Sequence, residues 1–236
     1  RLWFEVFAPA TTRAAHELLG ALGAAAVLWG SYQALHQPRL KLVVAYSTVA
    51  QLGYLFLLFP LAGAAGGGFT AWAGVALFAL AHAGAKTAMF LGAGSLMRAA
   101  GHDRLAELAP AARVRPVTMF AFALAAVSLI GLPPSGGFLA KWMLLNAALA
   151  TGQWWWVVVL AAGTLLAAAY LLRVLALPFA PATAAPAGPP LPRTLEWPAL
   201  ALALATIGLG FAASPLVAWL RVGAPVDGPV LLGGLP

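Results

Sequence analysis

The most constraining feature of the sequence is a long apolar stretch, 117–150, that residues unfavourable to helices interrupt near its middle. These residues are Gly131, Pro133, Pro134 and Gly136. A straight helix needs only about 20 residues to cross the hydrocarbon core of a membrane. A proline has no amide hydrogen, and its ring crowds the preceding turn. We therefore predict two half-helices with a break between them, at which the carbonyls of Leu129 and Ile130 lose their usual partners.

A lysine, Lys141, follows the break by about two helical turns and still lies inside the apolar stretch. Non-helical backbone survives in lipid only where protein buries it or water reaches it. A charged side chain at the middle of the bilayer costs at least about 3 kcal/mol. We therefore expect Lys141 to face a cavity or another helix. Two interpretations are open: an ion or proton pathway, and a packing kink whose lysine reaches back to the interface.

The composition identifies the class of protein. The chain has 236 residues, of which 63% are hydrophobic and 8% charged, whereas about a quarter of the residues of a soluble domain are charged. The net charge of +7 comes from basic residues in short loops between apolar runs, without the continuous patch that nucleic acid requires. We predict an all-α polytopic membrane protein in a lipid bilayer, with no nucleic-acid partner.

The chain contains no cysteine. This excludes thiolate-held iron–sulfur centres, CxxCH haem attachment and thiol catalysis within the chain. Apart from Glu17 near the outer end of the first predicted span, the predicted spans also lack the carboxylates that hard cations prefer. We predict no cofactor and no metal in this chain, so that any redox chemistry belongs to a partner.

Six transmembrane helices are expected, one of them broken. An interfacial lead-in, 1–13, precedes a membrane domain, 14–178, and a Pro/Ala-rich linker, 179–196, leads to a sixth span, 197–220, and a tail, 221–236. The five spans of the membrane domain are placed at about 14–35, 40–60, 69–98, 117–150 (broken) and 154–178. Because the sequence begins at Arg1 without a methionine, we expect a fragment of a longer protein.

The second span carries polar residues in an otherwise apolar helix. Tyr46, Ser47, Gln51 and Tyr54 recur at i, i+1, i+5 and i+8, roughly on one helical face. A polar face within lipid must meet protein or water. A polar path and ordinary hydrogen bonding between helices both account for the pattern.

The third span carries a histidine and a lysine four residues apart, His82 and Lys86. This spacing places both side chains on one helical face, about 6 Å apart along the axis. A single buried histidine is more often a packing residue than a relay. The pairing with a lysine near the middle of the membrane favours proton transfer instead.

The distribution of basic residues predicts an orientation. The loops after the first, third and fifth spans, with their flanks, hold eight of the 13 Lys and Arg residues, namely Arg39, Lys41, Arg98, Arg104, Arg113, Arg115, Arg173 and Arg193. The opposite side holds three, namely Arg1, Arg13 and Arg221, and the remaining two lie within spans. Cytoplasmic loops carry the excess of basic residues. We predict a bacterial-type inner (plasma) membrane with both ends of the chain on the outer side.

Three segments, AYSTVAQLGY (45–54), HAGAKTAMFLGAGSL (82–96) and SLIGLPPSGGFLAKW (128–142), resemble the antiporter-like proton-translocating subunits. This family is shared by the membrane arm of NADH:quinone oxidoreductase (complex I), multisubunit Na⁺/H⁺ antiporters and membrane-bound hydrogenases. The segments come in the family's order, and the resemblance covers nearly the whole chain.

The resemblance implies a bundle of roughly fourteen helices built from two inverted repeats, of which this chain corresponds to the last six. It aligns Lys141 with the residue after the broken helix that faces the outer half-channel. It aligns Lys86 with the lysine that passes protons along the central hydrophilic axis, and His82 with its companion. Gln51 stands where several relatives carry histidine. Other membrane subunits are implied as partners, with quinone, flavin or iron–sulfur centres on partner subunits.

The function that we predict is proton or cation translocation within a redox-driven pump or a multisubunit cation/proton antiporter. Proton transfer is assigned to Lys141, Lys86 and His82, with a secondary polar path through Tyr46, Ser47 and Gln51. The alternatives are a structural membrane subunit of the same kind of complex, and an unrelated secondary transporter that binds a solute at the helix break. The sequence leaves open which complex it is, whether the ion is H⁺ or Na⁺, and whether the chain serves an enzyme of the NADH:quinone oxidoreductase type.

Overall fold

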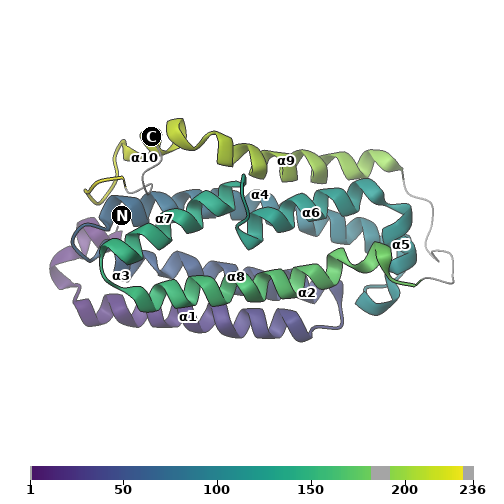
Figure 1. Ribbon diagram of the computed structural model, residues 1–236, viewed down its shortest axis with the longest axis horizontal. Helices are drawn as coiled ribbons and strands as arrows, with labels where there is room; N and C mark the ends of the chain where they lie inside the picture. The colour runs from purple at the N-terminus through teal and green to yellow at the C-terminus, as the bar shows by residue number, and fades with distance from the viewer. Residues whose placement is uncertain (1, 182–191, 231–236) are drawn as a thin grey trace.

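The computed structural model describes residues 2–181 and 192–230, and these fold into a bundle of helices that lie side by side (Figure 1). The longer helices are α1 (Arg13–His36), α2 (Leu40–Phe56), α4 (Gly68–Ala100), α6 (Pro116–Ile130), α7 (Gly136–Ala150), α8 (Trp154–Leu175) and α9 (Trp197–Phe211). Short helices connect or follow them, namely α3 (Leu58–Ala62), α5 (Ala109–Val114) and α10 (Ala213–Arg221). Single turns complete the fold, namely η1 (Leu2–Val6), η2 (Ala8–Ala10), η3 (Leu105–Glu107), η4 (Leu177–Phe179) and η5 (Arg193–Glu196).

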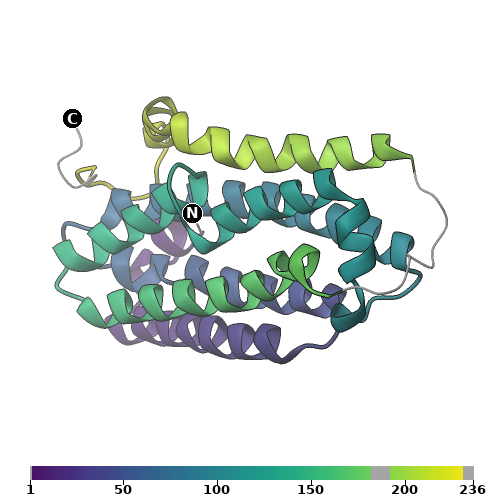
Figure 2. The ribbon, with the colours of Figure 1, turned by 45° about the vertical axis from the view of Figure 1, so that its right-hand side comes forward.

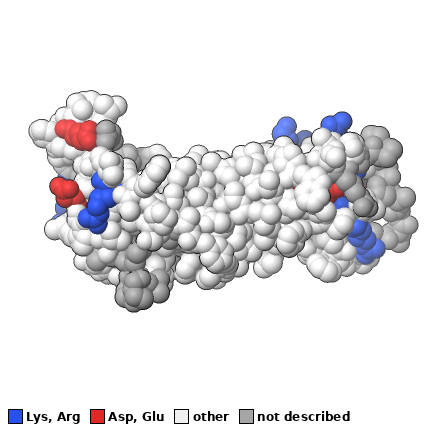
Figure 3. Space-filling model, turned by 90° about the horizontal axis from the view of Figure 1, so that it is seen from above, with Lys and Arg blue, Asp and Glu red and all other residues white. Residues whose placement is uncertain are grey.

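Within the described residues, five helical segments are long and apolar enough to cross a membrane. They are Arg13–His36, Leu40–Ala62, Gly68–Ala100, Trp154–Phe179 and Thr194–Phe211. On the face shown in Figure 3, charged side chains gather at the two ends of the molecule and leave an uncharged band between them. The predicted class, an all-α membrane protein, is confirmed. The count of six remains a prediction, because it adds the shorter apolar helices α6 and α7 as one broken span.

Parts of the predicted domain organisation lie outside the described residues. The centre of the linker, 182–191, and the end of the tail, 231–236, are among them. The described part of the linker ends in η5 (Arg193–Glu196), which leads directly into α9.

Small residues bring α1 and α2 into backbone contact. A Cβ added at Gly23 would lie 2.5 Å from the carbonyl oxygen of Gly53, and one added at Gly53 would lie 2.4 Å from that of Gly23. About two helical turns further along α1, a Cβ added at Gly30 would lie 2.5 Å from the backbone nitrogen of Ala50. Lipid tails are as apolar as leucine, so helices in a membrane associate through this kind of close packing. The pair α1 and α2 therefore forms a tight unit against which α8 and α4 are placed.

The interrupted stretch forms two helices joined by a short turn, as Figures 1 and 2 show for α6 and α7. Helix α6 ends at Ile130, and Gly131 follows with a φ of +88°, a conformation that glycine adopts without strain. Helix α7 begins after Ser135, whose Oγ accepts the backbone N–H of Phe138 at 3.1 Å. The C-terminal carbonyls of α6 and the first turn of α7 thus face each other across the break.

Candidate functional site

Lys141 occupies the break. Its Nζ donates to the carbonyl oxygens of Leu129 at 3.1 Å and Ile130 at 3.0 Å. These are the two carbonyls that Pro133 and Pro134 leave without amide partners. A third donation reaches Oγ1 of Thr164 in α8 at 3.3 Å. The ammonium has three donors, so each has an acceptor, and the carbonyl pair also belongs to the negative end of the α6 dipole.

The surroundings of Lys141 are aromatic and apolar. Its Nζ lies 4.7 Å from the centroid of the Tyr54 ring, within the range of a cation–π contact. A partly open cavity of about 440 Å³ lies between α7 and α8, and Lys141, Gly131, Trp142 and Thr164 line part of it. The side chain of Lys141 is 8% exposed. The ammonium is therefore buried but lies next to a space that its partners do not fill.

Lys86 is held differently. It lies on the uninterrupted helix α4, is 6% exposed, and points to α2, where its Nζ donates to the carbonyl oxygen of Val44 at 3.0 Å. It also donates to Oγ of Ser47. The hydroxyl of Ser47 in turn donates to the same Val44 carbonyl at 2.9 Å. The acceptors of Lys86 thus come from a neighbouring helix.

His82 lies one turn before Lys86 and is 9% exposed. Its ring lies nearly parallel to that of Phe78, at an interplanar angle of 11° with 6.1 Å between centroids. Its Nδ1 is buried and has no hydrogen-bond partner among the described residues. The structure places His82 beside Lys86, without a direct hydrogen bond between the two among those of the described residues.

One face of α2 extends from one lysine to the other. Ser47, Gln51 and Tyr54 follow Val44 at i+3, i+7 and i+10, and all are buried. Ser47 contacts Lys86, and Tyr54 lies under Lys141. We call Ser47, Gln51 and Tyr54 the polar face of α2. Between its ends, Nε2 of Gln51 donates to the hydroxyl of Tyr170 in α8 at 3.3 Å.

Of the residues predicted for a polar path, Ser47 and Gln51 belong to this face. Tyr46 is half-buried and packs against the main hydrophobic cluster of the bundle. Adjacent residues in a helix point about 100° apart, since one turn takes 3.6 residues. The side chains of Tyr46 and Ser47 therefore cannot both point directly at the same neighbouring helix.

A family profile described as NADH:quinone oxidoreductase/Mrp antiporter, TM, matches residues 2–167. The chain belongs to this family. It is 38% identical over 159 residues to NADH-quinone oxidoreductase subunit N of Desulforudis audaxviator, which covers 67% of this chain and 31% of the relative. It is 33% identical over 210 residues to subunit N 2 of Roseiflexus castenholzii, covering 85% and 41%.

Among solved structures, the fold is similar to a chain of the Mrp complex from Dietzia sp., with a TM-score of 0.74 and 26% identity, covering 86% of this chain and 45% of that one. The predicted family and fold are therefore confirmed. The chain spans between about a third and a half of the length of these relatives.

Within this member of the oxidoreductase/Mrp antiporter family, two residues that contact the site had not been singled out from the sequence. Thr164 and Tyr170 both lie in α8, where they supply the hydroxyls that meet Lys141 and Gln51. Polar side chains in an otherwise apolar span are a usable signal for such contacts. Their partners depend on how α8 packs against α2 and α7, which one sequence does not give.

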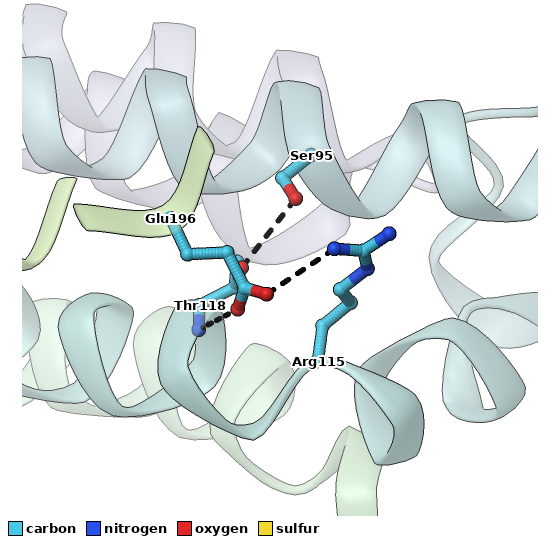
Figure 4. Close-up of polar contacts among 4 residues, drawn as sticks. All are labelled: Ser95, Arg115, Thr118 and Glu196. Carbon is cyan, nitrogen blue, oxygen red and sulfur yellow. Dashed lines mark hydrogen bonds and ion pairs between the residues drawn. The ribbon is translucent and has the colours of Figure 1, made fainter. Parts of the chain in front are cut away.

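A second buried polar group lies near the start of α6. Oε1 of Glu196 is 3.2 Å from Nη1 of Arg115, and its Oε2 accepts both the backbone N–H and the hydroxyl of Thr118, each at 2.8 Å (Figure 4). The hydroxyls of Thr118 and Ser95 are 3.4 Å apart. We call these four residues the Glu196 cluster. The sequence had suggested only that Glu196 belongs to the linker, although an acidic residue just before Trp197 and Pro198 is typical of a helix start.

Proposed function

We propose that this chain is the part of a membrane subunit that carries protons through the interior of the bundle. The observation that supports this proposal is the placement of two buried lysines, Lys86 and Lys141, at the two ends of the polar face of α2. Ionisable residues within membrane spans usually mark ion or proton pathways. Two lysines with a purely structural role would not need a row of buried polar side chains between them.

The two amines perform the proton transfer in this proposal. Burial disfavours the charged form of an amine, so a buried lysine can release a proton that an exposed one would keep. Like-charge repulsion makes simultaneous protonation of Lys86 and Lys141 less favourable, so loading one site promotes release from the other. His82 and the hydroxyls along α2 and α8 complete the path together with water.

Three replacements of Lys141 in the full-length protein test the proposal. We expect Lys141→Ala nearly to abolish proton uptake by reconstituted vesicles, and Lys141→Glu, which keeps a titratable group, to retain part of it. Lys141→Arg keeps charge and reach but cannot release its proton near neutral pH, and should be as inactive as alanine. All rates are compared at equal content of assembled complex. Native pumping by the arginine variant would contradict the proposal and support a static lysine.

We also propose that the assembly is a multisubunit membrane complex, because the relatives are named as subunits of NADH-quinone oxidoreductase and a similar fold occurs in an Mrp complex. Any thiolate-held iron–sulfur centre is assigned to partner subunits, since this chain has no cysteine, and any quinone or flavin is assigned to the partners with it. Mass spectrometry of the intact complex distinguishes a redox pump, which contains flavin and iron–sulfur subunits, from an antiporter, which contains only membrane subunits.

Both ends of the chain face outward in this proposal. Arg39 is 3.9 Å from Asp103, and Arg173 donates to the carbonyl of Leu35, so these basic residues gather at one end of the bundle. The positive-inside rule assigns that end to the cytoplasm. With His102→Cys, an impermeant thiol reagent should label the full-length protein from the cytoplasm, and with Gly66→Cys from outside. The reverse labelling would refute the orientation.

A further inference from the structure

The Glu196 cluster lies far along α6 from the lysine at the break. Glu196 is 2% exposed and Arg115 8% exposed by their side chains. Taking two charges out of water is unfavourable, and a well-packed apolar pair is often as stable. Stability alone therefore does not account for this pair, and the hydrogen bonds of the carboxylate to Thr118 suggest what else it does.

Glu196 occupies the N-cap position of α9, yet its side chain makes no capping hydrogen bond to its own helix. It accepts the N–H of Thr118 instead, in the first turn of α6. The first amides of a helix have no partner within the helix, and a carboxylate there also complements the helix dipole. The acidic residue that precedes α9 thus caps α6, as Figure 4 shows.

The opposite end of α6 carries a complementary charge. The last carbonyls, those of Leu129 and Ile130, accept the ammonium of Lys141. The positive end of α6 therefore meets the carboxylate of Glu196, which also pairs with Arg115 at the N-cap position of α6, and its negative end meets the ammonium of Lys141. Since α6 is one regular helix from Pro116 to Ile130, its axial position determines where the two carbonyls meet Lys141.

Helix α9 also contacts the break itself. A Cβ added at Gly210 would overlap the carbonyl oxygen of Pro134, and one added at Gly136 would lie 2.7 Å from Cβ of Leu209. Helix α9 lies alongside α6 in both ribbon views (Figures 1 and 2). It thus reaches from the start of α6, through Glu196, to the break that follows α6.

We propose that Glu196 is a positioning residue for Lys141: through its cap on Thr118 it fixes α6 along its axis, and so aims the carbonyls of Leu129 and Ile130 at the ammonium. The proposal rests on the proposed role of Lys141 in proton transfer. It adds that α9 holds α6 in position through a contact, Glu196 to Thr118, at the opposite end of α6 from Lys141.

Two double variants of the full-length protein in its native complex separate this cap from the ion pair. Arg115→Met with Glu196→Gln removes both charges but keeps an amide oxygen that can accept the Thr118 N–H. Arg115→Met with Glu196→Leu removes both charges and the acceptor. At equal content of assembled complex, we expect the first variant to translocate protons within about twofold of the native rate, and the second to be slower by about tenfold or more, as a misplaced reacting group predicts.

Equal rates for the two double variants, whether both native or both low, would overturn the proposal, because the acceptor would then have no effect. If the leucine variant does not assemble, Arg115→Met with Glu196→Ala serves instead, since its smaller side chain also removes both charges and the acceptor of the Thr118 N–H. It should likewise be slower than the glutamine variant by about tenfold or more, and a rate equal to that of the glutamine variant would equally overturn the proposal.

Lys141→Ala in the same assay distinguishes the two levels of the argument. A native rate for Lys141→Ala removes the proposed function. Loss of translocation in Lys141→Ala, together with equal rates for the two double variants, removes only the role of Glu196.

Discussion

Lys86 and Lys141 are both buried amines, but the backbone around them differs. Lys86 lies on an unbroken helix and takes its acceptors from α2, where Val44 still belongs to a regular helix. Lys141 follows a break and takes two acceptors from the broken backbone of its own apolar stretch. An ammonium at a helix break therefore meets carbonyls that no amide competes for. An ammonium beside an intact helix shares a carbonyl with other donors, here Ser47 and Thr48.

This difference predicts that the two lysine sites can be perturbed separately. After the near-complete loss expected for Lys141→Ala, the largest effect is expected at Lys86. Lys86→Ala should lower coupled proton translocation by at least about tenfold, the smaller side of what a positioned proton-transfer group contributes, with assembly intact. His82→Ala should do less, because His82 has no hydrogen bond to Lys86 among those of the described residues.

Proton uptake by vesicles at equal complex content measures both variants, and Lys41→Ala is the control, because Lys41 is exposed. If Lys86→Ala prevents assembly, and the few complexes that form pump normally, Lys86 is a structural residue and the comparison with Lys141 fails.

An intermediate effect is expected at the break. With Gly131→Ala, a φ of +88° would be strained by about 1–2 kcal/mol, and the new Cβ would lie 2.8 Å from Cδ of Lys141. We expect a several-fold loss of translocation because the lysine must move. Gly66→Ala is a matched control, since Gly66 has the same φ of +88° and no atom within 4 Å of an added Cβ. Equal losses in the two variants would attribute the effect to backbone strain alone.

The smallest effect is expected between the lysines. Tyr170→Phe removes the acceptor of Gln51, whose Oε1 already has no partner among the described residues. An unsatisfied buried amide costs about 1–3 kcal/mol, so we expect a lower unfolding temperature and about a twofold slower translocation. Tyr32→Phe is the control, since Tyr32 is 51% exposed. Unchanged values for Tyr170→Phe would place the path between the lysines elsewhere.

The helix break was predictable because it depends on local chemistry. Two prolines remove amides wherever they stand in a helix, so the freed carbonyls of Leu129 and Ile130 follow from the sequence. The position of Lys86 near the middle of a span follows equally from its place within the apolar run predicted at 69–98. The class of fold follows from the few charges and the long apolar runs.

The partners of these groups were not predictable because they depend on packing between distant helices. Thr164 meets Lys141 from α8, and Glu196 meets Thr118 from 78 residues away. One sequence does not say which faces of α8 and α9 turn inward. Tyr46 illustrates the same limit, since its neighbour Ser47 points to Lys86 while Tyr46 packs against apolar side chains.

The contact of Gly23 with Gly53 has a consequence for insulation. A proton path across a membrane must be separated from other water-filled passages, because a second continuous chain of water would let protons leak past it. Backbone touches backbone where Gly23 of α1 meets Gly53 of α2, so the two helices leave no room for a water molecule between them at this level. In the proposed function, these two glycines exclude water at this level, and a methyl group added at Gly23 or Gly53 would lie 2.5 Å or 2.4 Å from the opposite carbonyl oxygen and push the two helices apart.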